Sequence, residues 1–141
     1  MKNNFILQVG VKILLQNKEG KFLLVRRSLK KYPEINGRWD IVGGRIDAGK
    51  NLLENLGREV TEEVGLKIVG EPKLIAAQDI INHDRHVVRL TYVGEATGQV
   101  KLDMEENDRH RWYSFEEIKN LDDLDRYFKK LLKNGWKPEI V

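Results

Sequence analysis

The sequence of 141 residues contains no cysteine, which excludes disulfide bonds, thiol nucleophiles and thiolate metal sites. It also lacks a hydrophobic run long enough to span a membrane, so we expect no membrane association. Residues 1–5 show neither the apolar core nor the cleavage site of a signal peptide, which favours a cytoplasmic location. Internal repeats, linkers and low-complexity segments are absent as well.

The composition that remains is typical of a globular protein, with 33% charged and 40% hydrophobic residues. A chain of this length predicts one domain over residues 1–141 with a sizeable core. The net charge of +3 favours anionic ligands, although a mildly basic surface explains it equally well. Because the basic residues are scattered, we expect no specific nucleic-acid partner. The chain should be a monomer or a homodimer.

Apolar and β-branched residues predict several strands joined by short turns. The expected strands cover residues 5–15, 21–25, 39–42, 66–82, 86–95 and 110–113. The segment 66–82 should be one bent strand, with breaks at Gly70 and Pro72. Strands interrupted by helices indicate an α/β layer arrangement with a mixed sheet.

Two helices are expected near the end of the chain. Ser114 is a suitable N-cap for a short helix, and Glu117 would complete a capping box. Asp122 or Asp123 would begin the last helix, and residues from 134 onward should be irregular. The apolar face of the last helix would consist of Leu124, Tyr127, Phe128, Leu131 and Leu132.

The clearest helical signal covers residues 51–64. Asn51 is a good N-cap with Glu54 three residues later, and Gly65 is suited to end the helix. Gly57 is a poor helix former whose small size would allow another backbone to approach closely. One apolar stripe is expected from Leu53, Leu56, Val60 and Val64.

Three carboxylates share one arc of this helix. At about 100° per residue, Glu59, Glu62 and Glu63 lie together beside the apolar stripe, whereas Glu54 lies away from them. Glutamate-rich helix faces are often simply solvated. Here Arg58 and a preceding glycine-rich segment stand at fixed offsets, which favours a divalent metal site instead. Carboxylate oxygens suit Mg²⁺, and metals held in this way act on phosphates.

The segment around this helix resembles a known family signature. Residues 44–66 read GRIDAGKNLLENLGREVTEEVGL and resemble the signature of the Nudix hydrolases, G-x5-E-x7-R-E-U-x-E-E-x-G-U, where U is a bulky aliphatic residue. The preceding residues 39–44, WDIVGG, are similar to the family's Trp-x-x-Pro-Gly-Gly, with Val42 in place of proline. The resemblance implies the Nudix fold, a mixed β-sheet sandwiched between α-helices.

The resemblance also implies a function. Nudix hydrolases cleave phosphoanhydrides of nucleoside diphosphates linked to another group, using Mg²⁺ or, as an alternative, Mn²⁺. We therefore expect Glu59, Glu62 and Glu63 to bind metal and a nucleotide to be the substrate. Glu62, Glu63, Arg58 and Glu106 are the predicted catalytic residues. The general base is either Glu63 or a carboxylate of the acidic loop 103–108, with Glu106 ahead of Glu105.

Other residues are candidates for binding the substrate. Arg26 and Arg27 end a strand, and because strand side chains alternate, at least one should point toward the phosphates. Gly43 and Gly44 are expected in a tight turn, where their backbone N–H groups would donate to phosphate or to a glutamate of the signature. Aromatic stacking by Trp39 or Tyr32 is less expected than packing. The three histidines, His83, His86 and His110, show no ligand spacing.

Lys50 departs from the signature, which has glutamate at this position. If the missing carboxylate only supports the site, activity survives with weaker metal binding, and we favour this outcome. If it is needed for metal, the chain is a weakly catalytic nucleotide-binding module. Nucleoside triphosphates are the first expected substrates, with ADP-ribose, dinucleoside polyphosphates and NADH as alternatives. Processing of RNA 5′ ends would require a continuous basic groove.

Overall fold

The computed structural model describes residues 4–139, so the outermost residues of the predicted domain lie outside the described part. Its elements, in chain order, are β1 (Ile6–Gln16), β2 (Phe22–Arg27), β3 (Trp39–Asp40), β4 (Val42–Arg45), α1 (Leu52–Val64), β5 (Lys67–Asn82), β6 (Arg85–Thr97), β7 (Asn107–Tyr113), α2 (Phe115–Lys119) and α3 (Arg126–Lys133). In this part of the chain, no helix combines the length and hydrophobicity needed to cross a membrane.

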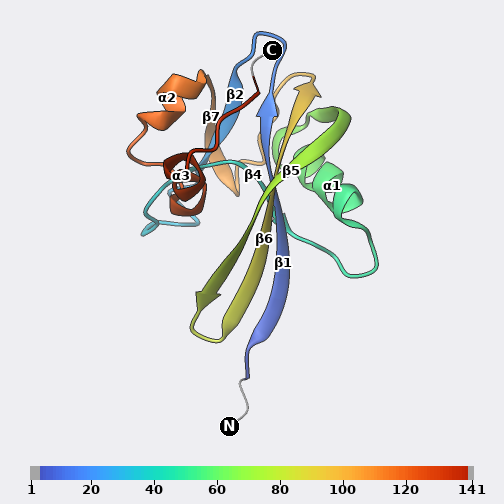
Figure 1. The fold of residues 1–141 in the computed structure, drawn as a ribbon, viewed down its shortest axis with the longest axis vertical. Helices are drawn as coiled ribbons and strands as arrows, with labels where there is room; N and C mark the ends of the chain where they lie inside the picture. The colour runs from blue at the N-terminus through green and yellow to red at the C-terminus, as the bar shows by residue number, and fades with distance from the viewer. Residues whose placement is uncertain (1–3, 140–141) are drawn as a thin grey trace.

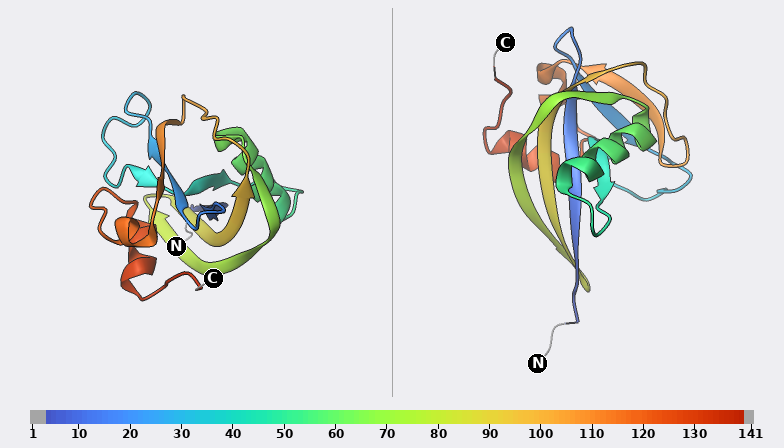
Figure 2. Two further views of the ribbon diagram at one scale, coloured as in Figure 1. Left: turned by 90° about the horizontal axis from the view of Figure 1, so that it is seen from above. Right: turned by 90° about the vertical axis from the view of Figure 1, so that its right-hand side faces the viewer.

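The strands form one mixed, curled sheet (Figure 1). The order is β3-β2-β1-β6-β5, with β4 pairing with β1 and β7 pairing with β2. Strands β1 and β6 run parallel, and the other pairs are antiparallel. Helix α1 lies on one side of the molecule, and α2 and α3 lie on the other (Figure 2). This is the expected α/β arrangement.

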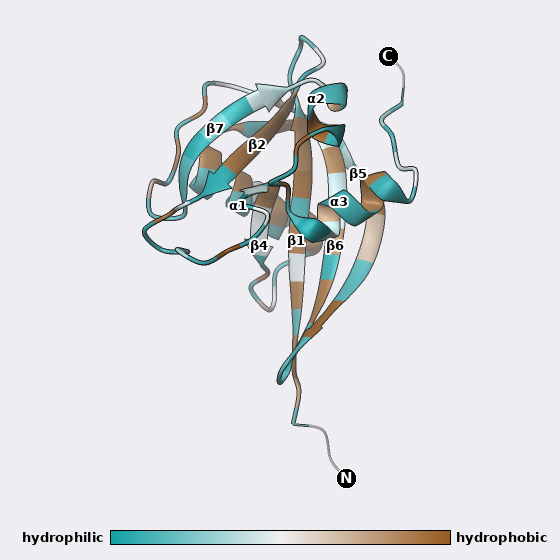
Figure 3. Cartoon of the chain, turned by 90° about the vertical axis from the view of Figure 1, so that its left-hand side faces the viewer, coloured by the Kyte–Doolittle hydropathy of each residue, from teal (hydrophilic) through white to brown (hydrophobic). Residues whose placement is uncertain are grey.

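Alternating side chains of β1 and β2 build two hydrophobic cores. Val11, Ile13 and Leu15 face a core that contains Leu56 and Val60 of α1. Leu14 and its neighbours on β2 face a second core shared with α2 and α3, whose largest buried side chains include Phe22, Leu24, Ile118 and Phe128. Hydrophobic segments accordingly lie in the strands between the helices (Figure 3).

The single bent strand predicted over 66–82 is confirmed as β5, whose register shifts between Val69 and Lys73, where Gly70 and Pro72 lie, and again between Leu74 and Ala76. Other predicted boundaries are wrong. Strand β7 begins at Asn107, three residues before its predicted start. The last helix begins at Arg126, because Asp125 and not Asp122 or Asp123 is its N-cap and accepts a bond from the Phe128 N–H. The capping box at Ser114 and Glu117 is confirmed.

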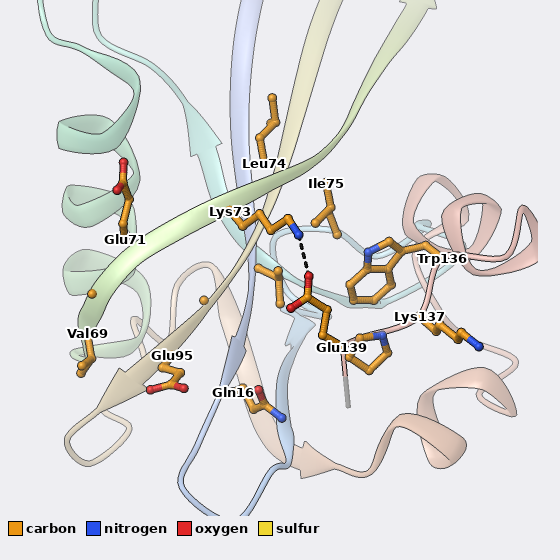
Figure 4. Close-up of a pocket in the computed structure, with 14 residues that line it drawn as sticks. Gln16, Val69, Glu71, Lys73, Leu74, Ile75, Glu95, Trp136, Lys137 and Glu139 are labelled. Carbon is orange, nitrogen blue, oxygen red and sulfur yellow. Dashed lines mark hydrogen bonds and ion pairs between the residues drawn. The ribbon is translucent and has the colours of Figure 1, made fainter. Parts of the chain in front are cut away.

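The segment 134–139 has no regular secondary structure, as expected, yet it packs against α2 and forms an ion pair with β5. Trp136 lies 5.9 Å from Phe115 between ring centroids, and Lys73 forms an ion pair with Glu139 at 2.6 Å (Figure 4). Between this segment and strands β5 and β6 lies a cavity of about 700 Å³. None of the catalytic, metal-binding or substrate-binding residues predicted from the sequence lines this cavity.

Candidate active site

Helix α1 holds the three glutamates, and its ends agree with the sequence. The Asn51 side chain accepts a hydrogen bond from the Glu54 N–H at 2.8 Å, and Gly65 ends the helix with φ +67°. Leu56, Val60 and Val64 are fully buried, but Leu53 is 44% exposed, so its predicted place in the apolar stripe is wrong. The face beside the buried stripe presents the glutamates to a cavity.

The predicted glycine turn is instead part of strand β4. Gly43 pairs with Lys12, and Gly44 pairs with Val11 on β1. A Cβ at residue 43 would lie 2.0 Å from the Val11 carbonyl oxygen, and one at residue 44 would lie 2.7 Å from Glu59 Oε2. Glycine is therefore required at position 43, where backbone lies in the way, whereas at position 44 it leaves room for the Glu59 carboxylate. The actual turn before α1 contains Gly49, with φ +89°.

One cavity of about 780 Å³ brings the predicted residues together with others from distant parts of the chain. It is lined by the three α1 glutamates, both β4 glycines and several basic and aromatic residues. Those that bear on the argument are Glu59, Glu62, Glu63, Gly43, Gly44, Lys12, Arg27, Tyr32, Asp40, Arg45, Arg89, Glu106, Asp125 and Tyr127.

The Glu63 carboxylate is held by hydrogen bonds from two strands. It accepts them from the Gly43 N–H at 2.9 Å and from Asn107 Nδ2 at 3.1 Å. Burial raises the pKa of Glu63 to about 7, against the lowering influence of Lys12 and these hydrogen bonds. The proximity of Glu59 raises the pKa further. The mutual repulsion expected from the sequence is thus present but smaller than the effect of burial.

Arg58 donates hydrogen bonds to two of the three glutamates. Its Nη1 donates to Glu59 Oε1 at 2.9 Å and to Glu62 Oε2 at 3.3 Å. Its Nη2 donates to the Arg45 carbonyl oxygen at 3.3 Å and to Asn55 Oδ1 at 3.1 Å. Asn55 is fully buried and in turn bonds the loop before α1. Arg58 therefore connects the glutamate face with β4.

The glutamates suit a divalent cation in donor type but are not arranged as a finished metal site. Glu59, Glu62 and Glu63 offer only carboxylate oxygens, which hard cations such as Mg²⁺ prefer. Within residues 4–139, however, no three acidic, histidine or cysteine side chains are grouped closely enough to hold a metal. Arg58 and Gly43 occupy several of the carboxylate oxygens instead. Metal binding would require these side chains to turn toward one another.

The two arginines that end β2 have different surroundings. Arg27 lines the cavity, with its guanidinium 4.2 Å from the centre of the Tyr32 ring and 3.6 Å from Asp40. Arg26 does not line the cavity. It forms an ion pair with Asp108 at 2.6 Å, so its nomination as a phosphate ligand is not supported. Strand alternation predicted one inward arginine but could not identify which.

Glu106 reaches the cavity, whereas Glu105 is exposed outside it. The Glu106 carboxylate accepts hydrogen bonds from the Lys31 ammonium and from the Tyr32 hydroxyl, the latter at 2.7 Å. Burial opposes ionisation of Glu106, but these hydrogen bonds outweigh it and lower its pKa. Ionised and occupied in this way, Glu106 is less suited than Glu63 to accept a proton.

A charged network on the cavity wall was missed by the sequence analysis. Asp40 is almost fully buried and pairs with Lys12 at 2.9 Å, while Arg89 pairs with Asp125 at 3.0 Å. Burial raises the pKa of Asp40, but Lys12, Arg89 and Arg27 outweigh this effect and lower it. The sequence carries no spacing signal for the network, because the sheet order and the position of the α3 N-cap bring these distant residues together.

The other residues considered from the sequence differ in whether they line the cavity. Trp39 packs edge-on against Tyr113 with ring centroids 5.6 Å apart and belongs to the core, as expected. Tyr32 lines the cavity, contrary to its expected role in loop packing alone. Lys50 is exposed and does not line the cavity.

These features agree with comparisons to known proteins. A family model described as NUDIX domain matches residues 6–134, and the chain belongs to that family, whose members generally depend on divalent metals. The structure of a MutT protein from Methanosarcina mazei Go1 superposes with a TM-score of 0.77 at 28% identity, covering 92% of this chain and 93% of that one.

Two curated relatives match shorter parts. The RNA pyrophosphohydrolase of Bartonella bacilliformis is 30% identical over 112 residues, which cover 77% of this chain and 61% of that protein. An 8-oxo-dGTP diphosphatase of Buchnera aphidicola is 38% identical over 52 residues, covering 37% of this chain and 38% of that protein. The chain thus spans less than two thirds of the length of either relative.

Proposed function

We propose that this chain is a divalent-metal-dependent pyrophosphohydrolase. Its substrate would be a nucleoside diphosphate linked to another group, with nucleoside triphosphates as first candidates. The observation that carries the proposal is the single cavity in which the α1 glutamates face Arg27 and Tyr32. The names of the two curated relatives support this reaction class.

The residues of the cavity would divide the work. Glu59, Glu62 and Glu63 would hold Mg²⁺ or Mn²⁺, which neutralises phosphate oxygens and lowers the pKa of water when bound. Arg27 would bind phosphate oxygens through charge-assisted hydrogen bonds. Arg58 would orient Glu59 and Glu62, which it already contacts. Glu63 would accept the proton of the attacking water, with Glu106 as the alternative base.

A phosphate-release screen over nucleotide classes with Mg²⁺ and Mn²⁺, with identified products, tests this function. We expect metal-dependent turnover of at least one substrate and its loss in Glu63→Gln. Glu54→Gln is the matched control, because it makes the same change on the same helix outside the cavity. Turnover that needs no metal, or that survives in Glu63→Gln but not in Glu106→Gln, would overturn the assignment of Glu63.

The exposed position of Lys50 favours catalysis over a purely nucleotide-binding module, because its side chain does not enter the cavity. A broad substrate panel without any turnover, together with nucleotide binding, would establish the binding module instead. RNA 5′-end hydrolysis is a second candidate, since the Bartonella relative aligns with 77% of this chain. ADP-ribose and dinucleoside polyphosphates belong in the same panel.

A further inference from the structure

Two arginines converge at the outer end of the candidate active site. Arg45 Nε and Arg85 Nη1 both donate to the same atom, Gln8 Oε1, at 3.3 Å and 3.1 Å. Throughout the described residues 4–139, neither guanidinium forms an ion pair with a carboxylate. Two cations therefore share one neutral acceptor, an arrangement that an anion between them would stabilise.

The sheet places this pair on the face that forms the cavity. Gln8, Gly10 and Lys12 share one face of β1, and Arg85, Val87 and Arg89 share one face of β6. The inner members of both sets line the cavity, as does Arg45. The ends of β1, β5 and β6 continue past the helices as a projecting ribbon (Figures 1 and 3). The cavity thus leads onto a basic strip.

The electrostatics of Arg45 agree with this geometry. Burial lowers the pKa of Arg45, and the nearby charges of Arg85, Arg27 and Arg89 lower it further. Arg85 and Arg89 are four residues apart on β6, about 13 Å along the strand. The outer arginine therefore lies beyond the residues that line the cavity, at a position suited to an anion other than the phosphates at the α1 glutamates.

Resting on the proposed function, we propose that Arg45, Gln8 and Arg85 form a subsite for a phosphate attached to the sugar of the bound nucleotide. A nucleoside that extends from the cavity toward this pair is itself neutral, so the anion that it would bring there is a phosphate esterified to a sugar hydroxyl. This phosphate is either a terminal 3′-phosphate or the first phosphodiester of an oligonucleotide. Planar guanidinium groups are suited to bind either one.

Equilibrium binding of ligands without an anhydride tests the subsite independently of hydrolysis. The three probes are adenosine 5′-monophosphate, adenosine 3′,5′-bisphosphate and a 5′-phosphorylated adenine dinucleotide, with the guanine series in parallel. We expect the wild-type protein to bind at least one compound with the additional phosphate about tenfold more tightly than the monophosphate. The preferred compound identifies the source of the phosphate.

Variants assign this preference to the arginine pair. Arg85→Gln should remove the tenfold preference while leaving the dissociation constant of the monophosphate unchanged. Arg109→Gln is the matched control, because Arg109 is exposed on β7 and does not line the cavity. A wild-type protein without the preference, or one that keeps it in Arg85→Gln, overturns the subsite. Failure of the proposed function would appear separately, as absent turnover of every nucleotide.

Discussion

Gly44 leaves room for the carboxylate of Glu59, since a Cβ at this position would lie 2.7 Å from Glu59 Oε2. We predict that Gly44→Ala displaces Glu59 and lowers kcat/KM about a hundredfold, as expected for a small misplacement of a catalytic group. The half-saturating Mg²⁺ concentration should rise. The thermal midpoint should change little, because a side-chain end can move where backbone cannot. Steady-state kinetics at varied Mg²⁺ measure the first two quantities, and a thermal melt measures the third.

Lys50, unlike Gly44, does not line the cavity. We predict that Lys50→Glu changes kcat/KM by less than about fivefold, because exposed charges contribute little to interaction energies. Its effect should be confined to a lower Mg²⁺ requirement. A wild-type protein that is inactive until Lys50→Glu restores turnover would contradict this prediction and would show that the fourth carboxylate is needed for metal.

Helix α1 contains a glycine for which the structure shows no need. Apart from its chain neighbours and the adjacent backbone of α1, a Cβ at Gly57 would have no heavy atom within 4 Å, so the close backbone approach anticipated from its small size does not occur. We predict that Gly57→Ala stabilises the protein by about 1 kcal/mol through the lower cost of ordering alanine in a helix. Urea denaturation measures this change. Kinetics should remain those of the wild type, and a loss of stability would reveal a contact that the fold does not show.

Helices and strands could be predicted from the sequence where a local pattern defines their ends. They could be predicted less well where packing against other helices or strands defines those ends. The caps at Asn51, Gly65 and Ser114 follow from side-chain chemistry within a few residues, and all three are present. The start of the last helix was misplaced, because Asp122, Asp123 and Asp125 are equally good caps in sequence. Only the packing of α3 on the sheet selects Asp125, which then pairs with Arg89.

At the scale of the whole molecule, the cavity depends on which strands lie side by side. Helical spacing alone identifies the group of three α1 glutamates, but it does not identify Arg45, Arg89 or Asp40. Arg45 and Arg89 lie on either side of Gly10 because β1 pairs with β4 and runs parallel to β6, and the pairing of β3 with β2 brings Asp40 to the same cavity. Such pairing joins residues far apart in the chain, and periodicity within one strand gives no information about it. The same limit left the choice between Arg26 and Arg27 open.

The enclosed carboxyl of Glu63 links the stability of the whole protein to pH. Its pKa in the folded protein is about 7, above the usual value of 4.5, mainly because of burial. Between these values the folded protein holds a proton that the unfolded chain has released. The stabilisation is therefore complete below pH 4.5 and is lost as pH rises through 7. The pKa values of Glu106 and Asp108 are lowered, so these two groups change the stability only at more acidic pH.

We therefore predict that, in a chelator, the free energy of unfolding falls by about 3 kcal/mol or less between pH 5 and pH 8. Urea denaturation across this range measures the slope, and Glu63→Gln should flatten it, because the amide does not titrate. Adding Mg²⁺ at pH 8 should restore stability to the wild-type protein, since a ligand that binds only the folded state stabilises it by mass action. The same addition should have a much smaller effect on Glu63→Gln. Equal slopes for both proteins in chelator would show that Glu63 ionises as freely in the fold as in the unfolded chain.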